Sequence, residues 1–206
     1  MCLSYKCYHI FKRIPHKFLS YFDIRWEVSY LLTQEIVPSK LGEWKNQIFE
    51  LVQKYNVRPL TYDDFLLGDK SNFTPSKLKI IKDRFINKEQ YTAYGIVSNG
   101  QLIYSCWTYR KELILSYGIR LPMEEDVLFM DDYCLPEYRG QRIHTQMNFY
   151  RLEQLYNMKN KKVAVLVHVY NKPALRSQIT AGFTIKNKIL VFKIGEIRGY
   201  KIKKLK

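Results

Sequence analysis

Apolar and polar positions repeat along this chain with two different periods. Some segments have apolar residues at helical spacing, which predicts amphipathic helices. They alternate with short runs of β-branched and aromatic residues, which predict strands. The predicted helices cover 41–55, 75–87 and 143–158, and the predicted strands cover 26–32, 91–98, 101–109, 127–135, 162–169 and 189–194. The chain is therefore expected to be an α/β protein with one sheet covered by helices.

Local signals mark where several of these elements end. Asn99-Gly100 joins two strand-like runs, and this dipeptide favours a type I′ hairpin. Residues 57–59 are predicted to be a strand that enters a helix capped by Thr61 or Asp63. From residue 57 the predicted order is strand, two helices, three strands, helix, strand, helix and strands.

The segment Pro136–His144 carries the clearest chemical signal. It links the apolar run that ends at Leu135 to an amphipathic helix through a short basic loop. The first N–H groups of a helix have no intrahelical partner and lie at the positive end of the helix dipole, so a pyrophosphate can bind them. The layout predicts a phosphate-binding loop.

This loop resembles the acyl-CoA-binding motif of GNAT-type N-acetyltransferases, whose pattern is Gln/Arg-x-x-Gly-x-Gly/Ala. The lead Pro136–Gly140 is complete, but Arg142 stands where the family usually has Gly, and His144 where it has Gly or Ala. Since Gly permits φ > 0, Arg142 is expected to take a conformation open to a residue with a Cβ. Its guanidinium can pair with a phosphate.

A second stretch resembles the same family at the expected distance. The run 171–177, Asn-Lys-Pro-Ala-Leu-Arg-Ser, leads to Ala181-Gly182-Phe183 and is similar to the family's Asn-x-x-Ala/Ser helix that ends in Gly-Phe. Asn171 suits the N-cap, Pro173 the first turn and Gly182 the position after the helix end. The two matches together span 126–185.

The resemblance implies a GNAT-type fold, which is a central, mixed, mostly antiparallel twisted sheet flanked by helices. It places an acyl-CoA-binding catalytic domain at 56–195. Residues 1–55 would then be a basic and aromatic N-terminal extension packed on the domain, and 196–206 a basic C-terminal tail. The basic amphipathic pattern of 1–22 leaves contact with a membrane surface open.

The resemblance also implies acetyl-CoA, or another acyl-CoA, as co-substrate. The residues that would bind it are Cys134, Leu135, Arg139, Gly140, Gln141, Arg142, Ile143, His144, Thr145, Asn171 and Ser177. Cys134 and Leu135 would offer main-chain groups to the pantetheine arm and the acyl carbonyl. We expect Cys134 to be a wall residue and no covalent acyl carrier, because apolar surroundings raise the pKa of a thiol.

Acyl transfer to an amine needs a base for the amine proton and a route for protonating the thiolate. In the resembled family, acidic residues on or facing the strand before the loop often supply the base, so Asp132 is the first candidate and Asp131 the second. Adjacent strand residues point to opposite faces, and only one can face the cleft. Gln178 stands where the family usually has the Tyr that protonates the thiolate. The proton would then come from water, Ser177 or another hydroxyl, or the thiolate would leave without being protonated.

Structural roles compete with these assignments. The two aspartates could simply balance the basic loop. His168 lies in an apolar strand and His144 at a helix start, so both are expected to be hydrogen-bonded structural residues. The four cysteines form no Cys-x-x-Cys pair and no array with histidines, which predicts reduced thiols and no metal site.

The formal charge of +15 over 206 residues favours anionic partners, which include CoA phosphates, nucleic acid and acidic membranes. No known nucleic-acid motif accompanies the charge, so a solvated basic face is the preferred interpretation. A content of 47% hydrophobic and 15% aromatic residues excludes a mainly disordered chain. The lack of a membrane-length apolar stretch and of an apolar leader predicts a cytoplasmic location.

These observations predict a bacterial, cytoplasmic N-acetyltransferase that moves an acetyl group directly from acetyl-CoA to a primary amine. The acceptor would be an amino sugar, a small amine or a peptide; a resemblance to proteins of bacterial surface-polysaccharide pathways points to an amino sugar. Two other functions stay open, namely a long-chain N-acyl amino acid or signal synthase on the same fold and a non-catalytic anion- or nucleic-acid-binding module. The oligomeric state stays open as well.

Overall fold

Eight strands form one sheet in the order β10-β9-β1-β8-β7-β4-β3-β2. The computed structural model describes residues 24–205. Neighbouring strands are antiparallel except for the parallel pair β7 and β8. The strands are β1 (Ile24–Glu35), β2 (Val57–Pro59), β3 (Tyr91–Ser98), β4 (Gln101–Tyr109), β7 (Val127–Cys134), β8 (Lys162–His168), β9 (Thr184–Ile194) and β10 (Ile197–Lys204). The predicted mixed, mostly antiparallel sheet is confirmed.

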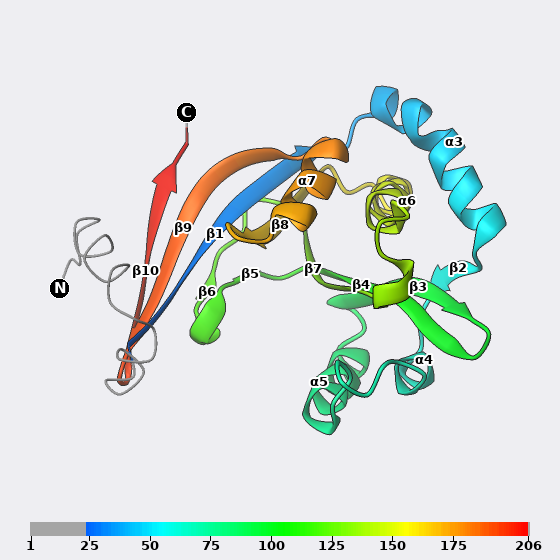
Figure 1. The fold of residues 1–206 in the computed structure, drawn as a ribbon. Helices are drawn as coiled ribbons and strands as arrows, with labels where there is room; N and C mark the ends of the chain where they lie inside the picture. The colour runs from blue at the N-terminus through cyan, green and yellow to red at the C-terminus, as the bar shows by residue number, and fades with distance from the viewer. Residues whose placement is uncertain (1–23, 206) are drawn as a thin grey trace.

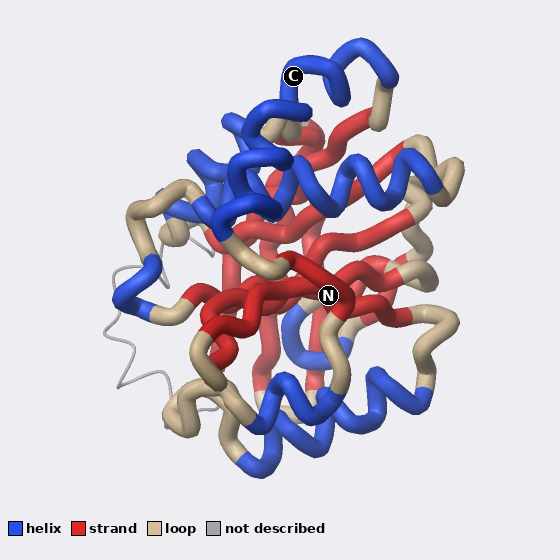
Figure 2. The backbone as a smooth tube through the Cα atoms, turned by 90° about the vertical axis from the view of Figure 1, so that its right-hand side faces the viewer, coloured by secondary structure: helices blue, strands red, loops and turns tan. Residues whose placement is uncertain are grey.

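Helices cover both faces of this sheet (Figures 1 and 2). On one face lie α3 (Pro38–Lys54), α6 (Ile143–Asn157) and α7 (Lys172–Thr180), and on the other α4 (Tyr62–Leu66) and α5 (Pro75–Ile86). From β2 onward the helices and the strands of the eight-stranded sheet follow the predicted order. The sheet therefore presents an α6 face and an α5 face, and these two names are used below.

The apolar stripe of α3 packs on α6. Leu41, Trp44 and Ile48 are buried, and the Trp44 ring stacks on Phe149 of α6 with centroids 4.8 Å apart. Val52 is exposed and lies outside this stripe. Burial of these side chains is the main force that holds the two helices together.

The predicted turn signals are found in place. Asn99 and Gly100 have φ angles of 51° and 72° and join β3 to β4, as a type I′ hairpin requires. Helix α4 begins after Thr61, whose N–H donates to the Asp64 carboxylate at 2.7 Å. Both signals act over a few residues, which is why the sequence alone shows them.

Strand pairing extends beyond the expected domain limits. β1, which belongs to the region expected as an N-terminal extension, lies inside the sheet between β8 and β9. β10 pairs with β9 along its whole length, so most of the expected basic tail is an edge strand. The division at residue 56 follows the family resemblance, whereas the sheet is set by hydrogen bonds between distant segments. The amphipathic pattern of 1–22 lies outside the described residues.

Between β4 and β7 the chain makes an excursion that the sequence pattern did not indicate. Two short strands, β5 (Leu113–Ile114) and β6 (Arg120–Leu121), pair with each other and are joined by the 3-10 turn Ser116–Gly118. Leu113 and Leu115 are buried in a cluster with residues of β1, β7 and β9. The excursion therefore covers part of the sheet that no helix covers in Figure 1.

Candidate functional site

A gap opens in the middle of the sheet where β7 and β8 separate. The two strands pair only from Val127–Phe129 to Val163–Val165, although β7 continues to Cys134 and β8 to His168. The two halves of the sheet diverge beyond this point (Figure 1). The start of α6 follows directly after β7, so the gap lies next to the predicted phosphate loop.

Main-chain groups of Cys134 face this gap. The N–H of Leu135 donates to the Ile103 carbonyl at 2.8 Å, which fixes that N–H toward β4. Because main-chain groups alternate along a strand, the N–H and carbonyl of Cys134 point away from β4, toward the gap. The carbonyl accepts a hydrogen bond from Arg139 Nε at 3.1 Å. Leu135 differs from the expectation, because its N–H is used by the sheet and its carbonyl by Tyr138.

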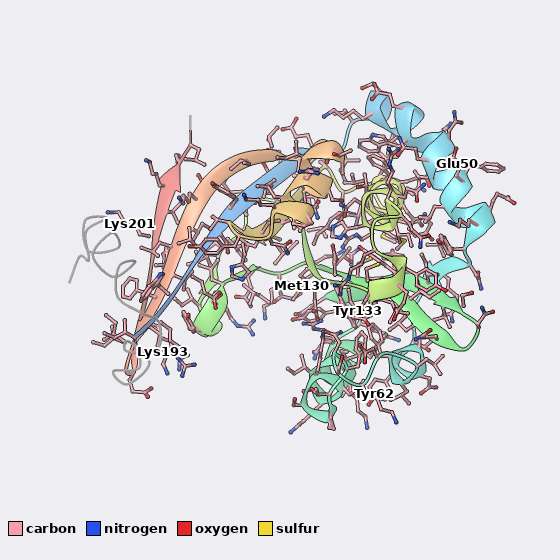
Figure 3. All side chains as sticks on the ribbon, viewed as in Figure 1. Glu50, Tyr62, Met130, Tyr133, Lys193 and Lys201 are labelled. Carbon is pink, nitrogen blue, oxygen red and sulfur yellow. The ribbon has the colours of Figure 1, made fainter. Side chains whose placement is uncertain are left out.

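A β-bulge on β7 separates the two candidate carboxylates. Tyr133 pairs with Ser105 and Met130 with Trp107, so two β7 residues stand opposite one β4 residue. Asp131 has a φ of 53° in this bulge and bonds to α5, whereas Asp132 bonds to α6. The side chains lie on opposite faces, as the two-residue alternation predicts. Figure 3 labels Met130 and Tyr133 on either side of the bulge, at the centre of the molecule.

Asp132 is the partner of a buried arginine. Its two oxygens accept hydrogen bonds from Arg151 Nη1 and Nη2 at 2.9 and 2.8 Å. Arg151 is fully buried on α6, lies 3.8 Å from the centroid of the Phe129 ring and also bonds to Asn148 Oδ1. Arg151 was not among the predicted site residues, although its place one turn after the apolar Met147 is a signal for a buried, paired charge. Asp132 thus has a structural ion pair, which the preference for Asp132 as the base did not anticipate.

His144 joins the same cluster from the first turn of α6. Its Nε2 lies 3.2 Å from the Gln178 amide nitrogen and 3.5 Å from Asp132 Oδ2. Burial lowers the pKa of His144 below 6.5, while the nearby Asp132 acts in the opposite direction, so the imidazole is neutral at pH 7. Tyr104 Oη and Gln178 Oε1 are buried nearby without a hydrogen-bond partner among the described residues. Such unsatisfied groups are typical of a place that water or a ligand fills.

The loop before α6 exposes its backbone. The first helical hydrogen bond runs from the Gln146 N–H to the Arg142 carbonyl, so the N–H groups of 143–145 have no intrahelical acceptor. Gly140 has a φ of 78°, and its missing Cβ would meet only open space. Arg142 has a φ of 61°, the left-handed conformation that Gly favours, which corrects the expectation for this residue. Arg142 therefore has a backbone conformation that residues with a Cβ adopt at some cost.

Helix α3 supports this loop, which the sequence did not show. Gln141 Oε1 accepts hydrogen bonds from Tyr55 Oη at 3.2 Å and Lys54 Nζ at 3.4 Å, both at the end of α3. Its Nε2 donates to the Glu137 carbonyl at 3.4 Å. Lys54 and Tyr55, which belong to the region expected as an N-terminal extension, therefore help to position the candidate phosphate loop.

Several other predicted site residues meet between α6 and α7. Thr145 Oγ1 and Ser177 Oγ are 2.8 Å apart and link the two helices. Asn171 caps α7, because its Oδ1 accepts the Ala174 N–H at 3.2 Å. Ile143 is buried, and its side chain packs in a cluster with Leu51, Tyr104 and Met147.

Two reactive side chains lie in positions that suit structural roles. Burial raises the pKa of the Cys134 thiol, with Arg139 acting weakly in the opposite direction, so little thiolate forms at neutral pH. His168 is exposed at the end of β8, 3.3 Å from Ser29 Oγ and 3.6 Å from a Glu27 oxygen. Both observations agree with the interpretation of these residues as a wall residue and a structural histidine.

A cavity of about 710 Å³ lies at the opposite end of α6, where its lining includes Val37, Tyr156 and Lys161. No group of three or more His, Cys, Asp or Glu side chains that could hold a metal ion occurs within residues 24–205. None of the helices in this part of the chain is long and apolar enough to cross a membrane.

Comparison with known proteins relates this fold to a family. No family model and no curated protein matches the chain. A GCN5-related N-acetyltransferase-like protein from Streptococcus suis is similar in structure, with a TM-score of 0.57 and 10% identity over 97% of this chain and 69% of that one. A functionally unknown conserved protein from Staphylococcus epidermidis has a TM-score of 0.51 and 12% identity over 88% and 68% of the two chains. The chain thus has a GNAT-like α/β fold at low sequence identity to these proteins.

Proposed function

We propose that this chain is an N-acyltransferase that moves an acetyl group from acetyl-CoA to a primary amine. The observation that carries the proposal is the exposed loop 139–142 followed by the N–H groups of 143–145, which have no intrahelical acceptor, beside the gap between β7 and β8. A phosphate can bind these N–H groups, and the open space at Gly140 lets it come close.

The other predicted cofactor residues have matching roles. Arg139 and Arg142 supply positive charge to the phosphates, and Gln141 keeps the loop in place through α3. Thr145, Ser177 and Asn171 line the approach between α6 and α7. The thioester supplies the acyl group, and the gap-facing Cys134 N–H is placed to polarise its carbonyl.

Asp131 is our proposed base in place of Asp132, because its side chain is 28% exposed although Arg84 and Lys77 contact it, whereas Asp132 is 12% exposed and pairs with the fully buried Arg151. The acceptor ammonium gives one proton to Asp131, and the amine nitrogen then bonds to the acyl carbon while the carbon–sulfur bond breaks. The second nitrogen proton passes to the departing sulfur. Gln178 cannot release a proton, so we assign this relay to the neutral His144, which contacts its amide.

Calorimetric titration with CoA and acetyl-CoA tests the proposal. We expect one binding site in the natural protein and none in Gly140→Asp, because the new carboxylate repels phosphate. Gly195→Asp is the matched control, since Gly195 also has a positive φ and open space around its missing Cβ. Absent binding in the natural protein, or equal losses in both variants, would contradict the proposal.

Donor and acceptor assays separate the remaining alternatives. Preference for a long-chain acyl-CoA or an acyl carrier protein over acetyl-CoA would identify a signal synthase. Steeply salt-dependent nucleic-acid binding without competition by CoA would identify a non-catalytic module. Acetylation of amino sugars over peptides would support a polysaccharide pathway, and cell fractionation tests the cytoplasmic location.

A further inference from the structure

A cluster of charged side chains on the α5 face of the bulge takes no part in the candidate phosphate loop. Asp131 Oδ2 accepts a hydrogen bond from Arg84 Nη1 at 2.8 Å, and Asp131 Oδ1 lies 3.5 Å from Lys77 Nζ. The side chains of Asp131, Lys77 and Arg84 are 28%, 26% and 13% exposed. The three charged groups thus lie together at the bulge and each is partly exposed.

The cluster has a surplus of positive charge. Lys77 and Arg84 contact one carboxylate, Asp131, and aromatic rings hold the two cations in place; the Asp69 carboxylate acts on Tyr133 of the same face. Lys77 Nζ lies 4.9 Å from the centroid of the Phe73 ring, and the Arg84 guanidinium lies 5.0 Å from that of Trp107. A fixed and partly desolvated positive charge attracts anions more strongly than a mobile surface lysine does.

Two hydrogen-bond donors on the same face have no partner among the described residues. They are the Tyr133 hydroxyl and the Asn72 amide nitrogen, both buried. Tyr133 is 8% exposed and its ring packs on Phe73 at 4.9 Å, while Asn72 Oδ1 lies 3.4 Å from Lys77 Nζ. A buried donor without a partner costs about 1–3 kcal/mol, which a ligand oxygen would recover. Unused donors beside surplus positive charge therefore fit a ligand group with several oxygens.

From these contacts we infer that the acceptor carries an anionic group, a carboxylate or a phosphate, close to the amine that is acylated. This inference rests on the proposed acyltransferase function. The anionic group binds Lys77 and Arg84, and the ammonium lies against Asp131. A polycationic amine would meet the two cations without an anion of its own, so the cluster selects against it.

Phosphate titration tests the binding site without requiring any transfer reaction. The protein is saturated with CoA and titrated with inorganic phosphate at constant ionic strength, and tryptophan fluorescence is followed because Trp107 lies under Arg84. We expect a saturable change that Lys77→Met and Arg84→Met weaken at least about tenfold. Lys79→Met, at an exposed position of the same helix, is the control that should leave it intact. If phosphate causes no saturable fluorescence change, or if Lys79→Met weakens it as much as Lys77→Met does, the proposed anion site is wrong.

Paired acceptors test the substrate class. Glycine is compared with glycinamide, and glucosamine 6-phosphate with glucosamine, and spermidine serves as the polycation; products are measured by mass spectrometry. At least one anionic member should be acetylated about tenfold faster than its partner, and Lys77→Met should abolish the difference; which pair responds tells carboxylate from phosphate. Equal or faster acetylation of glycinamide, glucosamine or spermidine overturns the inference. If no amine reacts, the transferase proposal fails, and the phosphate titration alone decides the site.

Discussion

Asp131 and Asp132 are neighbours in the chain, yet their carboxylates have very different surroundings. Asp132 lies on the α6 face in a bidentate pair with the fully buried Arg151. Asp131 lies on the α5 face, partly exposed, with Arg84 and Lys77 around it. One bulge thus lets a single strand direct one carboxylate to a buried partner and the next to a partly exposed cluster.

The largest expected difference between the two faces is in stability. Arg151→Met leaves the Asp132 carboxylate buried without its partner and should lower the free energy of unfolding by about 3–5 kcal/mol. Arg84→Met removes a more exposed contact from Asp131, which keeps Lys77, and should cost about 1 kcal/mol or less. Urea unfolding measures both variants. Equal losses of unfolding free energy in the two variants would show that Asp132 does not depend on its arginine more than Asp131 does.

The next difference concerns catalysis. Asp131→Asn should lower kcat/KM at least about 100-fold with CoA affinity unchanged, because the proposed base is lost. Asp132→Asn should chiefly lower stability, since Arg151 then lacks its counter-charge. Free-thiol release and CoA calorimetry report the two effects separately. Slow transfer by a stable Asp132→Asn protein, together with normal transfer by Asp131→Asn, would return the role of base to Asp132.

A smaller effect should appear in the pH dependence of stability. The pKa of His144 is lowered by burial in the folded state, so the unfolded chain binds more protons below about pH 6.5 and stability falls as the pH falls. His144→Gln should reduce this loss between pH 7 and 5. His168→Gln changes an exposed histidine and serves as the control. A pH profile that neither variant alters would contradict the buried, neutral state of His144.

The smallest expected effect is at the loop backbone. Arg142 has a φ of 61°, which costs a residue with a Cβ about 1–2 kcal/mol, while Gly loses about 0.5–1 kcal/mol of chain entropy. Arg142→Gly should therefore stabilise the fold by about 0.5 kcal/mol in thermal unfolding. Lys159→Gly, at a φ of 63° near the other end of α6, should give a similar gain. A loss only in Arg142→Gly would mean that the arginine side chain itself holds the loop.

Features that depend on a few consecutive residues could be predicted from the sequence. The Asn99-Gly100 hairpin, the Asn171 cap of α7 and the loop that leads into α6 are of this kind, because turns, caps and helix starts are local. The order of elements from residue 57 follows from the alternation of the two apolar periods together with the family resemblance.

Features that depend on distant pairing could not be predicted. The place of β1 between β8 and β9, the support of Gln141 by Tyr55, and the packing of the β5–β6 excursion all join segments far apart in the chain. The sequence could not show which aspartate is held in an ion pair for the same reason, since this depends on the distant Arg151. Each of these contacts requires a register between elements that no local pattern specifies.

Backbone hydrogen exchange with and without CoA is the most direct test of the central claim that the exposed loop before α6 binds the cofactor. The account predicts slower exchange of the 139–146 amides when CoA is bound, and unchanged exchange of 69–77 on the α5 face. Protection of 69–77 with none at 139–146 would contradict it, because the cofactor would then occupy the other face of the sheet.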